Sequence, residues 1–112
     1  MQIFETFKKL FFFFFNVSGV ISNMTSLEVL DMSHNEITEW PEGSLGPLPN
    51  LTQINLSHNL LSDIPIDELT GSLKLSLVDL QNNRLTRFYD EFMPLMEHNA
   101  TKVLMQGSIK RF

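Results

Sequence analysis

Two histidines are the residues of this chain best suited to metal chemistry, because they occupy the same place in a repeated pattern. His34 and His58 lie 24 residues apart, and each follows a serine and precedes an asparagine. Imidazole is the commonest metal ligand in proteins, so two neighbouring rings would be a plausible start of a metal site. The next position in phase is Asn82, which is a poor third ligand. We therefore predict no metal site and interpret the histidines as turn residues that stack on one another.

No recognised catalytic motif occurs in the chain. The sequence lacks a glycine-rich phosphate loop, a Gly-x-Ser-x-Gly elbow, a His-Glu-x-x-His pair and any cysteine nucleophile. The acidic cluster Asp63, Asp67 and Glu68 falls on a predicted loop, where such residues usually increase solubility. We predict that the protein is not an enzyme, has no catalytic residues and binds no cofactor.

The histidines belong to a pattern of apolar residues and one asparagine that occurs three times. The copies read Leu27-x-x-Leu30-x-Met32-x-x-Asn35-x-Ile37, Leu51-x-x-Ile54-x-Leu56-x-x-Asn59-x-Leu61 and Leu75-x-x-Val78-x-Leu80-x-x-Asn83-x-Leu85. Alternation around Leu30 and Met32 predicts a strand with Asp31 on the opposite face. An asparagine amide can bond backbone groups left unpaired where a strand ends. We therefore expect Asn35, Asn59 and Asn83 to form a structural ladder.

Stacking of the copies would produce an α/β solenoid with a parallel sheet on its concave face. The outward residues of successive strands then line up in three columns: Val29, Gln53 and Leu77; Asp31, Asn55 and Asp79; Ser33, Ser57 and Gln81. One interpretation is a mildly acidic, hydrogen-bonding surface for a protein partner. The alternative is a solvated face without a partner.

The segments that return to the next strand carry apolar residues in phase. Their positions are Ile37, Trp40, Leu45 and Leu48; Leu61, Ile64, Leu69 and Ser72; Leu85, Phe88, Met93 and Met96. Ser72 is the exception, and Leu73 would take its place. Pro41 and Pro65 share one phase and suit irregular backbone or a first helical turn. We expect coil with short α-helical or 3₁₀ turns on the convex side, and methionines that fill the core without a cofactor.

Length, charge and sequons limit the class of protein. A chain of 112 residues has room for one domain, and a net charge of −5 with a pI near 5.0 argues against nucleic acid. Cysteine is absent, which excludes disulfides and cysteine-based zinc sites within the chain. Glycosylation sequons occur at Asn16, Asn23, Asn50, Asn55 and Asn99, more than the roughly one or two expected by chance. The repeat itself accounts for Asn50 and Asn55, but the excess predicts a secreted or cell-surface glycoprotein.

Residues 1–18 lie outside the repeat pattern, which begins near Gly19. They contain Lys8-Lys9 and the run Phe11 to Phe15, followed by the small residues Val17-Ser18-Gly19. This order resembles a signal peptide, although its apolar part is short. Two alternatives remain: a native segment, and translated intron sequence, since codons for these residues can form an intron's 3′ boundary. The apolar run is too short to span a membrane.

From Gly19 to Gly107 the chain resembles the extracellular leucine-rich-repeat family, whose pattern and period these copies follow. That family includes Toll-like receptor ectodomains, chaoptin-like adhesion proteins and secreted non-catalytic subunits of luciferin monooxygenases. After the third copy, a strand with Val103 and Met105 facing inward is expected. The family's C-terminal cap has cysteines, and residues 108–112 carry none, so we interpret the chain as a fragment with residues 19–107 as repeats.

The resemblance implies a protein-binding module that uses its concave sheet. Two alternatives are a non-catalytic accessory subunit of a secreted enzyme complex and a structural spacer of repeats. The motif is specific for a fold and nearly silent on the ligand.

Overall fold

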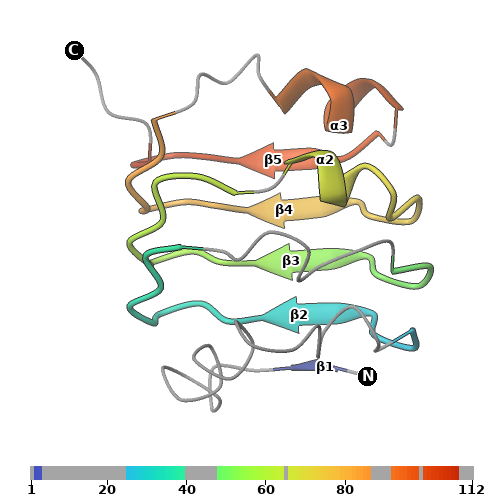
Figure 1. Ribbon diagram of the computed structural model, residues 1–112, viewed down its shortest axis with the longest axis horizontal. Coiled ribbons are helices and arrows are strands. Elements are labelled where there is room, and N and C mark those ends of the chain that lie inside the picture. Colours follow the sequence, from blue (N-terminus) through green and yellow to red (C-terminus); the bar gives the residue numbers. More distant parts are fainter. Residues whose placement is uncertain are drawn as a thin grey trace.

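The computed structural model describes residues 2–3, 25–39, 48–64, 66–86, 92–98 and 100–108. Within these ranges the chain forms one parallel sheet whose strands follow sequence order (Figure 1). The strands are β1 (Gln2–Ile3), β2 (Val29–Asp31), β3 (Gln53–Asn55), β4 (Leu77–Asp79) and β5 (Lys102–Leu104). Two short helices, α2 (Ile66–Leu69) and α3 (Met93–His98), lie in the segments that connect β3 to β4 and β4 to β5.

The strand register follows the sequence repeats until the last pair. Val29 pairs with Gln53, and Gln53 pairs with Leu77, which preserves the 24-residue spacing. Leu77 then pairs with Lys102, so the final connection is one residue longer. Because the connections from β2 to β3 and from β3 to β4 have the same length, equivalent residues of these strands lie opposite one another. Their side chains therefore form straight columns across the sheet.

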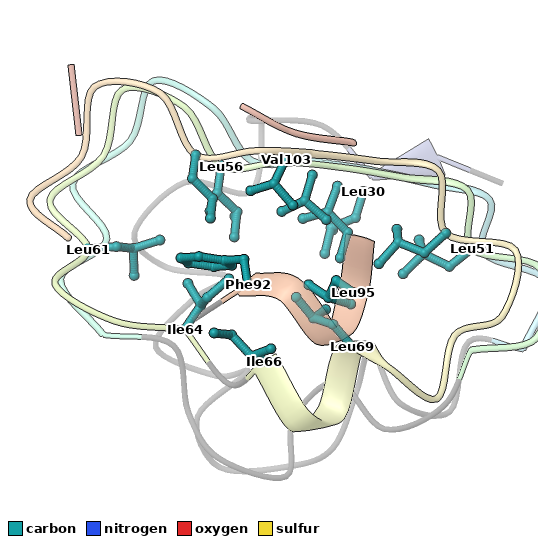
Figure 2. Close-up of a cluster of buried hydrophobic side chains, with 14 of the residues drawn as sticks. Leu30, Leu51, Leu56, Leu61, Ile64, Ile66, Leu69, Phe92, Leu95 and Val103 are labelled. Carbon is teal, nitrogen blue, oxygen red and sulfur yellow. The ribbon is translucent and has the colours of Figure 1, made fainter. Parts of the chain in front are cut away.

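The apolar positions of the three sequence copies form the core. Leu30, Ile54 and Val78 are the central residues of their strands and are at most 1% exposed. Figure 2 shows Leu30, Leu56 and Val103 directed from the sheet toward Phe92 and Leu95. Fully burying one such aliphatic side chain is worth about 1.5–3 kcal/mol, so this layer supplies the main driving force for folding.

The two helices are short and bury residues three positions apart. Ile66 and Leu69 of α2 are buried, as are Phe92, in a 3₁₀ turn just before α3, and Leu95. Residues separated by three lie on one face of a helical turn, which brings both toward the sheet. The prediction of short α-helical or 3₁₀ turns in the connections is confirmed for these two segments.

The methionines of α3 do not fill the core as predicted. Met93 is 38% exposed and Met96 is only partly buried, whereas Phe92 and Leu95 are fully buried. The prediction applied the 24-residue spacing to this connection, but the buried residues Phe92 and Leu95 lie 26 residues after Ile66 and Leu69, the buried residues of α2. The segment therefore presents Phe92 and Leu95, rather than the methionines of α3, to the core. Met105, the third predicted core methionine, is buried.

Leu73 does not replace Ser72 in the core. Ser72 is 1% exposed, and Leu73 is 76% exposed. The Ser72 hydroxyl oxygen accepts a hydrogen bond of 3.1 Å from the backbone N–H of Leu48. A leucine at position 72 would leave that buried amide unpaired, which explains why the polar residue occupies the inward position.

The two ends of the sheet differ from the sequence expectation in one respect. The strand with Val103 and Met105 facing inward is confirmed, with exposed fractions of 5% and 8%. The N-terminal segment, however, was given no strand, and the structure pairs β1 with β2, Gln2 opposite Val29. Apolar alternation over two residues is too short to predict a strand.

Candidate binding face

One face of β2, β3 and β4 is left uncovered by the core and presents two columns of side chains. Gln53 is exposed, and Val29 and Leu77 beside it are half-buried. The second column consists of Asp31, Asn55 and Asp79, all half-buried. Neighbouring strands lie about 4.8 Å apart, so each column is a closely spaced row across the sheet.

The acidic column is held in one orientation by bonds to the backbone just beyond each strand. Asp31 Oδ1 accepts from the Ser33 N–H at 3.1 Å, and Asn55 Oδ1 accepts from the Ser57 N–H at 3.0 Å. Asp79 Oδ1 accepts from the Gln81 N–H at 3.1 Å. These contacts fix the column before any partner arrives, which lowers the entropic cost of binding.

The predicted third column differs from the structure. Ser33 and Ser57 are only 8% and 7% exposed, so these two serines add little to the binding face. Their hydroxyl groups donate to Asp31 Oδ1 and Asn55 Oδ1, both at 2.7 Å. Gln81 is half-buried and its Nε2 donates to Asp79 at 3.0 Å. The side chains of the third column therefore hydrogen-bond to those of the second column and help to fix their orientation.

Behind the strand ends, the asparagines link each turn to its neighbour. Asn59 Nδ2 donates to Leu56 O in its own turn and to Met32 O in the preceding turn, both at 3.0 Å. Asn59 Oδ1 accepts from the buried Ile37 N–H at 3.1 Å. Asn83 repeats the arrangement, with Leu56 O at 2.8 Å and the Leu61 N–H at 3.0 Å.

Asn35 is half-buried, and its Nδ2 donates to Met32 O and Ser33 O within its own turn, at 2.8 and 3.1 Å. The arrangement of Asn59 and Asn83 positions the turns, and through them the binding face.

The two histidines stack at the rim of this face. The ring centroids of His34 and His58 lie 4.3 Å apart, and the ring planes differ by 10°. The side-chain amide nitrogen of Asn82 lies 3.3 Å from His58 Nε2. All three residues have a positive φ between 56° and 58°, so one backbone conformation repeats along the column. The described residues contain no group of three His, Cys, Asp or Glu able to hold a metal ion.

A row of hydroxyl groups at the other end of the strands was missed from the sequence. Thr52 Oγ1 donates to Glu28 O and Ser76 Oγ donates to Thr52 O, both at 3.0 Å. Thr101 Oγ1 continues the row with a 2.7 Å bond to Leu75 O. The signal was the hydroxyl residue after Leu51 and Leu75. Of these two residues only Thr52 was interpreted, as part of the sequon at Asn50.

Two of the predicted glycosylation positions lie within the described residues. Asn50 bridges two turns, since its Nδ2 donates to Thr25 O at 3.0 Å and its Oδ1 accepts from Lys74 Nζ at 3.3 Å. Asn55 lies on the binding face, with its Oδ1 already engaged by Ser57. Asn16, Asn23 and Asn99 lie outside the described residues.

A family model described as Leucine rich repeat matches residues 18–61, which include β2 and β3. No curated protein matches the chain. The family match supports a leucine-rich-repeat protein, and together with the parallel sheet it fits a leucine-rich-repeat-like α/β fold.

Leucine-rich-repeat domains generally mediate protein–protein interactions and are typically not catalytic. The match therefore suggests a protein partner. Within the part of the chain that the structure describes, no helix combines the length and apolar character needed to cross a bilayer.

Proposed function

We propose that this chain is a protein-binding module of an extracellular protein and that the uncovered face of β2, β3 and β4 is its binding surface. The observation that carries the proposal is the fixed acidic column, Asp31, Asn55 and Asp79, which aligns across three strands. Each residue is oriented by a bond from the backbone N–H two residues later in the same turn, so the column presents hydrogen-bonding groups without needing to be ordered by the partner.

The apolar column beside it adds contact area. Val29 and Leu77 are half-buried and flank the exposed Gln53, so this column combines aliphatic surface with a central polar side chain. Non-obligate protein–protein interfaces likewise combine apolar area with hydrogen-bonding groups. The proposed partner is therefore a folded protein surface or an extended segment that lies across the strands.

Further parts of the proposal concern the whole chain. The matched strand register supports a solenoid of about three full 24-residue repeats within residues 19–107, with residues 1–18 and 108–112 outside the repeats. The sequons support secretion and glycosylation. Resemblance to the Toll-like receptor and chaoptin-like group supports extracellular location.

Site-specific crosslinking would test the binding face directly. A photoreactive amino acid is placed at Gln53 on the face, and in a matched chain at Ser62, which is exposed beyond the strand end. Both chains are incubated with an extract of the source tissue and irradiated. We expect one protein to crosslink from position 53 and not from position 62, and to be displaced by excess unmodified chain. Equal crosslinking from both positions would contradict the proposal.

A further inference from the structure

Ser108 stands at the position where a fourth asparagine of the ladder would lie. Because Leu77 pairs with Lys102, the residue that corresponds to Asn83 in the β5 turn is Ser108 rather than a residue 24 positions on. Counting at the 24-residue spacing of the sequence misses this equivalence by one residue.

The backbone supports the equivalence independently. The N–H of Asn82 donates to Gln106 O at 3.0 Å, just as the N–H of His58 donates to Gln81 O at 2.9 Å. Gly107 has a φ of 71° and takes the left-handed conformation that Asn82 and His58 adopt in their turns. A Cβ at Gly107 would lie 2.6 Å from Asn82 Oδ1, so a larger residue at this position would require the Asn82 side chain to move. Ser108 follows directly, as Asn83 follows Asn82.

Ser108 does not make the bonds that the asparagines make. Its side chain is buried, at 2% exposed, and its hydroxyl oxygen has no hydrogen-bond partner among the residues that the structure describes. In the other turns the asparagine Oδ1 accepts from a backbone N–H of the preceding turn, Ile37 for Asn59 and Leu61 for Asn83. The equivalent amide for position 108 belongs to Leu85. A serine Oγ occupies the place of an asparagine Cγ, one bond short of the required donor and acceptor atoms.

We infer that Ser108 is an incomplete position of the asparagine ladder, and that the turn after β5 consequently opens locally while the turns held by Asn59 and Asn83 stay closed. A buried hydroxyl without a partner destabilises the closed turn, and the missing amide bonds remove the cross-link to the preceding turn. Local opening of this kind exposes backbone amides to exchange with solvent. The turn after β5 is thus less stable than the turns after β3 and β4, which Asn59 and Asn83 hold.

Native-state hydrogen exchange of the full chain, followed by NMR, tests the inference. The amides of Ile37 and Leu61 should be protected, and the amide of Leu85 should exchange at least about tenfold faster. Leu85 protection equal to that of Leu61 would contradict the inference, because the Leu85 amide would then be held as firmly as one bonded to an asparagine.

Three variants separate the missing bonds from a general weakness of β5. Ser108→Asn should slow exchange at Leu85 by about tenfold and leave Ile37 unchanged. Asn83→Ser, the matched control, should speed exchange at Leu61 by a similar factor. Ser108→Ala should melt at the same temperature as the wild-type chain or higher, because the hydroxyl makes no bond. A lower melting temperature for Ser108→Ala, or a Ser108→Asn chain that does not fold, would overturn the inference.

Discussion

At the scale of single residues, the side chains that matter most are polar and buried. Asn59 bonds both its own turn and the preceding one, and Ser72 satisfies the buried amide of Leu48. Each of these groups lies where backbone must turn inside the molecule and cannot pair with another strand. A buried polar backbone group without a partner costs about 1–3 kcal/mol, comparable to the burial of an aliphatic side chain. The turns are therefore held by side chains rather than by backbone pairing alone.

Asn59→Ala should lower the stability of the chain clearly. The substitution leaves the buried Ile37 N–H without its acceptor, at a cost of about 1–3 kcal/mol. It also removes one bond each from Met32 O and Leu56 O, which still accept from Asn35 and Asn83. Thermal unfolding followed by circular dichroism measures the effect. Gln53→Ala, on the exposed face of β3, is the control and should change stability by no more than about 0.5 kcal/mol. Equal melting temperatures for the two variants would show that Asn59 does not stabilise the turns.

At the scale of secondary structure elements, the 24-residue period holds for strands β2 to β4 but not for the convex side after β4. The connection from β4 to β5 is one residue longer than the connection from β3 to β4. Phe92 and Leu95 are buried in it, 26 residues after the buried Ile66 and Leu69 of α2, and Met93 lies at the surface. The residues that face the core on the convex side therefore do not follow the strand register alone.

Phe92 and Met93 provide a direct test of this phase. Phe92→Ala removes a fully buried ring and should destabilise the chain by about 3–5 kcal/mol. Met93→Ala removes a side chain that is 38% exposed and should cost much less, about 1 kcal/mol at most. Urea unfolding of both variants supplies the comparison. A larger loss of stability for Met93→Ala than for Phe92→Ala would contradict the observed burial. It would support the sequence prediction that Met93 faces the core.

The sequence predicted the elements whose periodicity was unbroken. All three strands that follow the repeated pattern were predicted, because Leu30, Ile54 and Val78 are each followed by a polar residue and then a second apolar one. The position of β5 was predicted from Val103 and Met105, which also alternate. Met93 and Leu73 were misplaced because a fixed period detects neither a change of spacing within one connection nor a buried hydroxyl that pairs with backbone.

The candidate site was less predictable than the fold. Position relative to the strand places a residue on a face, and this placed the columns that contain Gln53 and Asn55. Position in the strand does not reveal which polar side chains are turned away from solvent by a hydrogen bond to a neighbouring residue. Ser33 and Ser57 turn toward the carboxylate and amide of the neighbouring column, and their burial depends on that contact.

At the scale of the whole molecule, the proposed extracellular location predicts that the chain is N-glycosylated. Expressed behind a functional signal sequence in a eukaryotic secretory host, the chain should carry glycans, with Asn23 or Asn99 modified. Mass spectrometry before and after glycosidase treatment measures the occupancy of each sequon. Asn23→Gln and Asn99→Gln together should remove most of the mass difference. A secreted chain with all five sequons unmodified would contradict the proposed location.

Binding of a protein by the uncovered face of the sheet is tested most directly by the affinity of two variants for the crosslinked partner. Gln53→Arg adds a bulky charge on the face, and Ser62→Arg adds the same charge at an exposed position beyond it. Both variants should melt like the wild-type chain, because neither side chain is buried. Calorimetric titration should show that Gln53→Arg weakens binding by at least about tenfold, while Ser62→Arg changes it by less than about twofold. Equal affinities for the two variants would contradict the claim that this face is the binding surface.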